Sequence, residues 1–85
     1  MAGRAPLQRT DLRLTKRILD GHDPDAALEL CRRHDLRDIR ALERRCRMFG
    51  FSVGTDNVGA FDAMCDGLAA YQAEVLDAIP TRDEL

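Results

Sequence analysis

Apolar residues recur at helical spacing along most of the chain, and this pattern predicts four helices. The first is expected over residues 7–20, where Leu7, Leu14 and Ile18 fall on one face. Gly21 follows as the residue that ends the helix, because glycine adopts the left-handed backbone of a C-terminal cap without strain. We expect this helix to bury that single face against the rest of the protein.

The second helix is expected over residues 23–33, and its start is the most clearly marked in the chain. The Asp23 side chain can accept hydrogen bonds from the free backbone N–H groups of a first helical turn. Pro24 suits that turn because its missing N–H would have had no partner there. A short break at His34 and Asp35 then leads to the third helix.

The third helix is expected over residues 36–49, followed by Gly50 as the C-terminal stop and Phe51 as the contact that a capping motif places after it. Its apolar residues are spaced by three or four positions and form one stripe. They are Leu36, Ile39, Leu42, Cys46 and Phe49.

The fourth and longest helix follows a loop with the sequence SVGTDNVG, in which Thr55 or Asp56 can cap it, and Pro80 ends it. Its stripe alternates spacings of three and four over three heptads: Val58, Phe61, Cys65, Leu68, Gln72, Val75 and Ile79. Two interpretations stay open. The helix lies across the other three and buries the stripe in the core, or the stripe is the seam of a homodimer in which Gln72 fixes the register.

Together these segments predict an all-α fold, a small bundle of four helices in a single domain over residues 1–85. Residues 1–6 and 81–85 are expected to be frayed tails. Aromatic residues are few, so the core is expected to consist of aliphatic side chains. The N-terminus lacks the apolar run of a signal peptide, and no stretch has the ~18 apolar residues of a membrane span. We therefore expect a cytoplasmic protein with no membrane partner.

The residues that carry chemistry do not assemble into a catalytic motif. The sequence has no glycine-rich phosphate loop, no nucleophile elbow and no HExxH, so we expect a protein that is not an enzyme and needs no cofactor. Three cysteines on apolar helical faces are interpreted as reduced core thiols. With His34 they have the composition of a zinc site, but their spacing argues against one. These four residues are Cys31, His34, Cys46 and Cys65.

Charge is distributed unevenly along the chain. Residues 1–50 carry twelve basic and eight acidic residues, a net charge of +4, whereas residues 51–85 carry one basic and seven acidic residues, a net charge of −6. Four arginines of the third helix share an arc of roughly 80° at 100° per residue, away from its apolar stripe. This row, Arg37, Arg40, Arg44 and Arg47, with Arg33 one turn earlier, is the candidate binding site. Glu43 lies beside it and can pair with Arg47.

The second and third helices resemble the helix-turn-helix motif of DNA-binding proteins over ALELCRRHDLRDIRALERRC, residues 27–46. In this resemblance Cys31 is the small residue of the first helix and Asp35 holds the turn position, where φ is positive. Leu42 is the core residue of the recognition helix. The chain departs from the motif in having aspartate rather than glycine at the turn, and in a spacing from Leu36 to Leu42 that is one residue too long.

Two functions follow from these features, and we place the first ahead. The first is a small prokaryotic or phage-type DNA-binding regulator of transcription, with the arginine row on DNA and the fourth helix forming a homodimer. The second is a protein-binding inhibitor or adaptor whose arginines meet an acidic protein surface. Exposed Phe51, Val53 or Met48 near the third helix would favour the second, whereas the net charge of −2 weighs against the first.

Overall fold

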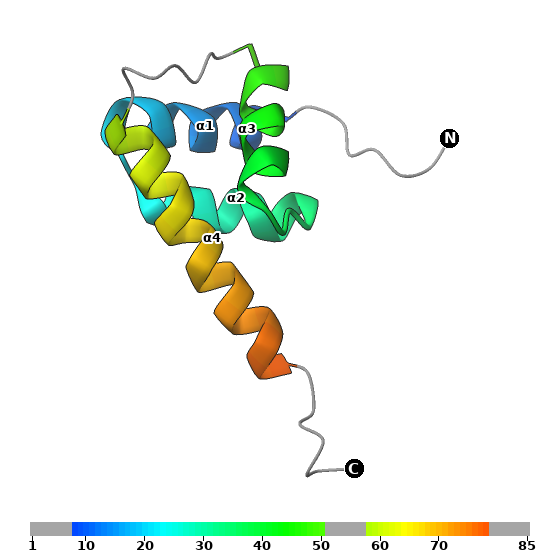
Figure 1. Ribbon diagram of the computed structural model, residues 1–85. Helices are drawn as coiled ribbons and strands as arrows, with labels where there is room; N and C mark the ends of the chain where they lie inside the picture. Colours follow the sequence, from blue (N-terminus) through cyan, green and yellow to red (C-terminus); the bar gives the residue numbers. More distant parts are fainter. Residues whose placement is uncertain (1–7, 51–57, 79–85) are drawn as a thin grey trace, which may run out of the picture.

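A computed structural model describes residues 8–50 and 58–78, and it confirms an all-α fold (Figure 1). Helices hold 86% of these residues, and none of them lies in a strand. The helices are α1 (Arg9–Gly21), α2 (Pro24–His34), α3 (Ile39–Met48) and α4 (Val58–Ala78). None of the four is long and apolar enough to cross a membrane.

The long helix α4 lies across the others, as one of the two sequence interpretations predicts. In Figure 1, α1 and α2 run side by side, α3 crosses them near one end, and α4 runs diagonally past all three. Most of its packing is against α2 and then α1, while α3 contacts α2 and α4 far less. The C-terminal half of α4 extends beyond the other helices, so part of its surface has no neighbour among the described helices.

Small residues allow α2 and α4 to approach closely. A Cβ atom on Gly67 would lie 2.5 Å from the Ala27 Cβ and from the Pro24 carbonyl oxygen, and 2.6 Å from the backbone nitrogen of Leu28. Atoms this close overlap, so only glycine fits at this crossing. Although glycine weakens an isolated helix, here it is the residue that lets two backbones pack together.

The core lies between α4 and the α1–α2 pair, and α3 closes one side of it. Its members are mainly aliphatic, as the scarcity of aromatic residues predicts. The largest fully buried apolar side chains are Ile18, Leu30, Leu42 and Met64, with Cys31 and Cys46 beside them.

Several helix ends differ from those predicted, and two of the differences have a clear local cause. α1 continues through Gly21, and the left-handed residue is His22, with φ of 50°. α3 begins at Ile39, because the Asp38 side chain accepts a hydrogen bond from the Ala41 N–H at 2.8 Å and caps the helix there. The start of α2 is as predicted: Asp23 accepts from the N–H groups of its first turn.

The stripe predicted on α4 is not the face that packs into the core. Of its members, Leu68 is buried and Val75 is partly buried, whereas Val58, Phe61, Cys65 and Gln72 are exposed. The buried face lies to one side of that stripe and consists of Ala60, Ala63, Met64, Leu68 and Tyr71. The sequence predictions for Leu7, Phe51, Val53, Thr55, Asp56, Ile79 and Pro80 and for the frayed tails lie outside the described residues.

Candidate interaction surface

The turn between α2 and α3 is fixed by contacts with α4. Asp35 adopts the left-handed conformation, with φ of 52° and ψ of 47°, at the turn position of the helix-turn-helix resemblance. The Tyr71 hydroxyl donates a hydrogen bond to its carboxylate at 2.7 Å, and Arg37 donates another at 3.2 Å. These two hydrogen bonds lower the pKa of Asp35, and the bond from Tyr71 has the larger effect. The turn is therefore tied to the middle of α4.

A groove borders this turn on the exposed side of α4. The Gln72 side-chain amide donates a hydrogen bond to the Arg37 carbonyl oxygen at 2.8 Å and so bridges the turn and the helix. The groove has a volume of about 260 Å³, and its lining includes Tyr71, Val75 and Leu76. Its lining is thus mostly carbon, with polar groups at one side.

The structure divides the five predicted arginines into two groups. Arg33 donates to the buried Asp11 carboxylate at 2.7 Å and to the Gln8 side chain at 3.1 Å, and it lies on α2. Arg37 precedes α3 and pairs with Asp35. Neither belongs to a row on α3.

The other three, Arg40, Arg44 and Arg47, lie together on the exposed side of α3 and are called here the α3 arginines. With Glu43 they line a shallow hollow of about 200 Å³. No described residue forms an ion pair with any of them, and Glu43 does not pair with Arg47. Their charges are therefore available to an external partner.

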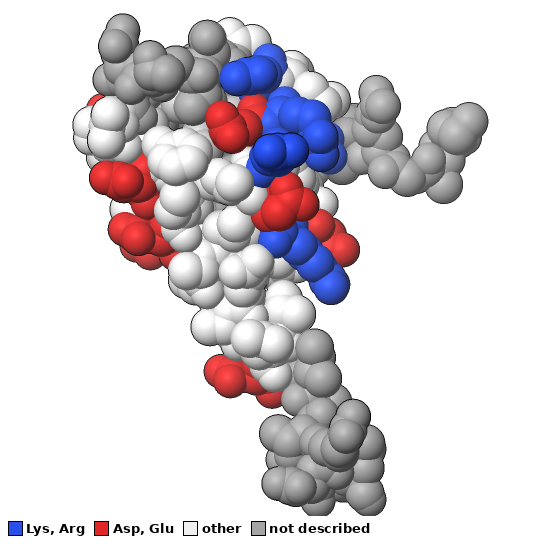
Figure 2. Space-filling view, in the orientation of Figure 1, with Lys and Arg blue, Asp and Glu red and all other residues white. Residues whose placement is uncertain are grey.

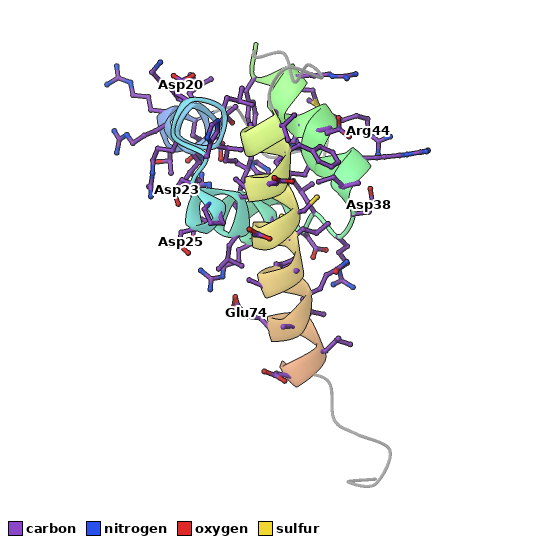
Figure 3. All side chains as sticks on the ribbon, turned by 60° about the vertical axis from the view of Figure 1, so that its left-hand side comes forward. Asp20, Asp23, Asp25, Asp38, Arg44 and Glu74 are labelled. Carbon is purple, nitrogen blue, oxygen red and sulfur yellow. The ribbon has the colours of Figure 1, made fainter. Side chains whose placement is uncertain are left out.

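The α3 arginines are not equivalent in their distance from α4. Glu43 lies on the side of α3 next to α4: burial and, after it, the charges of Asp62, Asp66 and Glu43 raise the pKa of the Cys65 thiol. At about 100° per residue, Arg47 and Arg40 follow Glu43 around α3, and Arg44 lies farthest round. Figure 3 shows Arg44 on the side of α3 that faces away from α4.

Beside α3, on the far side of Glu43 from the arginines, α4 exposes a strip of mainly apolar residues. The exposed fractions are 63% for Val58, 39% for Phe61 and 68% for Leu76. With Cys65 and Gln72 these residues fall within an arc of about 60° on the helix and are called here the α4 strip. On α3, Met48 is also 55% exposed. An apolar surface of this kind beside charged groups is typical of a site of protein contact.

The opposite border of the α4 strip is acidic. Asp62, Asp66 and Asp77, called here the acidic edge, are exposed and have no ion-pair partner among the described residues. Glu74 lies farther round α4, where it binds Arg32 of α2 at 2.6 Å. Figure 2 shows the resulting order across one face: basic groups over α3 with acidic groups among them, a mostly uncharged surface over α4, then acidic groups.

The cysteines do not form a common site. Cys31 and Cys46 are buried, as predicted for core thiols, and burial raises their pKa values to about 11 and about 12. The prediction is wrong for Cys65, which is exposed on the α4 strip. In the part of the chain that the structure describes, no three His, Cys, Asp or Glu side chains gather as metal ligands would.

A buried polar cluster that was not predicted from the sequence joins α1 to α2. The fully buried Asp11 carboxylate accepts hydrogen bonds from Arg33 Nε at 2.7 Å and from His34 Nε2 at 2.9 Å. Asp11 also accepts from the Gln8 N–H at 3.2 Å, a local capping contact that its position in the first turn could have suggested. Its partners on α2 are more than twenty residues away, and no local pattern indicates them.

Comparison with known proteins adds no further constraint. No protein family, curated protein or solved structure matches the chain. The function is therefore argued from the geometry alone.

Proposed function

We propose that this chain is a non-enzymatic protein-binding module, of the adaptor or inhibitor kind, that docks on an acidic surface of another protein molecule. The observation that carries the proposal is that the α4 strip and the α3 arginines share one side of the molecule, with Glu43 between them. Apolar anchors supply most of the affinity at protein interfaces, and complementary charge supplies orientation and association rate. This one face offers both.

The test is affinity capture with the full chain, followed by purification of the main bound protein and measurement of its Kd. Phe61→Ser removes an apolar anchor and Arg40→Glu reverses one charge, and we expect each to raise the Kd at least about tenfold. Arg13→Glu is the matched control, because Arg13 is an exposed arginine of α1 with no ion pair among the described residues. Equal Kd values for all four proteins would contradict the proposal.

A DNA-binding regulator is the second candidate, because α2, the Asp35 turn and α3 have the order and the positive φ of the helix-turn-helix resemblance. We place it second for two reasons. Arg33 and Arg37 are engaged by carboxylates, and Asp35 and Asp38 stand at the N-terminal end of α3, the end that reads bases in that motif.

A mixed-sequence duplex distinguishes the two candidates. DNA binding through α3 requires affinity at ~50 mM salt that falls steeply as salt rises, because phosphate contacts release counterions. It also requires that Arg44→Ala weaken binding while Phe61→Ser leaves it unchanged. If the wild-type chain does not bind at ~50 mM salt, the DNA candidate fails.

A further inference from the structure

We infer that the partner on this face is a second copy of this chain, with the two α4 helices side by side and running in the same direction. The inference rests on the proposed function, whose partner it names. It starts from the order of features across the face: the α3 arginines with Glu43 on their side nearest α4, then the α4 strip, then the acidic edge. The acidic surface that the arginines require is present at the other border of the same strip.

Symmetry decides how two such faces meet. A two-fold axis parallel to α4 places the α4 strip of one copy on that of the other. It also exchanges the two borders of the strip, so the acidic edge of each copy lies opposite the α3 arginines of the partner copy. The two helices then run parallel. A two-fold axis perpendicular to α4 makes the helices antiparallel and sets acidic edge against acidic edge. Like charges in contact are unfavourable, so the charges select the parallel arrangement.

The parallel arrangement also fits the levels of the charged residues along α4. Asp62 and Asp66 lie in the N-terminal half of α4, and α3 runs at the height of this half (Figure 1). Arg47 and Arg40 flank Glu43 on α3, one turn away in each direction. Each acidic pair of one copy therefore reaches the level of an arginine pair of the other.

Charge reversal tests the pairing across the two-fold axis. Asp62→Lys/Asp66→Lys and Arg40→Glu/Arg47→Glu should each be monomeric, because in each variant like charges face one another. An equimolar mixture of the two should form a heterodimer, because every facing pair then has opposite charges. Sedimentation velocity reports mass, and circular dichroism of each variant shows whether its helices are intact. Two folded variants that stay monomeric when mixed would overturn the pairing.

Disulfide formation tests the direction of the helices. Cys65 is the exposed thiol among the three, so mild oxidation of the wild-type chain should link Cys65 to the same residue of the partner copy. Gln72→Cys in a Cys65→Ser background should also link to itself, because equal positions meet all along parallel helices. In antiparallel helices the two positions cannot both meet themselves, since they lie about 10 Å apart along the axis. Cys65→Ser alone is the control that should not link.

The outcomes separate this inference from the function on which it rests. A dimer that shows both disulfides and the heterodimer rescue supports the inference. A chain that stays monomeric and forms no disulfide, yet binds a different purified protein through Phe61 and Arg40, overturns the second copy and leaves the proposed function intact. A monomer that binds no protein through these residues overturns both.

Discussion

At the scale of single residues, the Asp11 cluster shows how one buried charge can be held in a small core. Burial alone would raise the pKa of Asp11, but hydrogen bonds from Arg33 and His34 outweigh it and hold the pKa below its usual value. The carboxylate therefore stays ionised at neutral pH and joins the start of α1 to the end of α2. The ring centroid of His34 also lies 5.8 Å from that of Phe49, so the Asp11 cluster continues toward the end of α3.

Replacing Asp11 with Asn should destabilise the protein by about 1–3 kcal/mol at neutral pH, because Arg33 loses its charged acceptor. Because the pKa of Asp11 is lower in the folded than in the unfolded protein, its ionised form stabilises the fold. This stabilisation is complete above the pKa of the unfolded state, about 3.9, and is lost as the pH falls through the pKa of the folded state. The difference between the wild type and D11N should therefore shrink below about pH 4. Urea unfolding from pH 7 to pH 3 measures it.

Asp20→Asn is the matched control, since Asp20 and its partner Lys16 are both exposed and such pairs contribute little. It should change the free energy of unfolding by less than about 0.5 kcal/mol. If D11N and the wild type lose the same stability between pH 7 and pH 3, the buried ion pair does not stabilise the fold.

The three thiols should differ in reactivity because their exposure differs. In the dissociated, folded chain at low protein concentration, Cys65 should react with a thiol reagent, whereas Cys31 and Cys46 should react only as the protein unfolds, since they are buried and burial raises their pKa values. Labelling at pH 8, followed by mass spectrometry of peptides, should show one modified cysteine before denaturant is added. Equal rates at all three would contradict the described core.

At the scale of elements, periodicity predicted four helices, but it did not show which side of α4 is buried. The predicted stripe and the observed core face both contain Leu68, and both repeat at three and four residues. What separates them is the close approach of α4 to α2 at Gly67, on the side of α4 where small residues such as Ala60 and Ala63 are buried. A hydrophobic pattern favours large side chains, so it selected the exposed side, which holds Val58 and Phe61.

Local sequence likewise predicted the arginine row only in part. Spacing on a helix put Arg37, Arg40, Arg44 and Arg47 on one face, and three of these lie together on α3. Arg37 falls outside because the Asp38 cap starts the helix later than the apolar stripe suggests. The partners of Arg33 and Arg37 come from contacts with α1 and within the turn, and helical periodicity carries no information about such contacts.

Gly67→Ala should destabilise the protein although alanine is the better helix former. The intrinsic gain is about 1 kcal/mol, but the added methyl group meets backbone atoms of α2 that cannot move aside. Overpacking of this kind costs about 1–3 kcal/mol, so we expect a net loss of about 1–2 kcal/mol in urea unfolding. Gly21→Ala is the control: nothing lies within 4 Å of its Cβ position, and it should be neutral or stabilising.

At the scale of the whole molecule, the charge split of the sequence becomes an arrangement in space. The basic half contributes the α3 arginines and the acidic half contributes the acidic edge, and the α4 strip separates them on one face (Figure 2). The α3 arginines and the acidic edge have no ion-pair partners among the described residues of one copy, and their positions allow them to pair between two copies. The same arrangement explains why the net charge of −2 is a poor guide to what this face binds.

Association through the α4 strip should make thermal stability depend on protein concentration, because binding to the folded state alone stabilises it by mass action. For a dimer of domains this size, we expect the wild-type Tm to rise by about 3–5 °C for each tenfold increase in concentration. Phe61→Ser should show a Tm independent of concentration and equal to that of the dilute wild type, since Phe61 lies outside the core. Differential scanning calorimetry over three decades of concentration measures both. If the wild-type Tm is as constant as that of the variant, the strip does not hold two copies together, and the stability of the fold comes from the single chain.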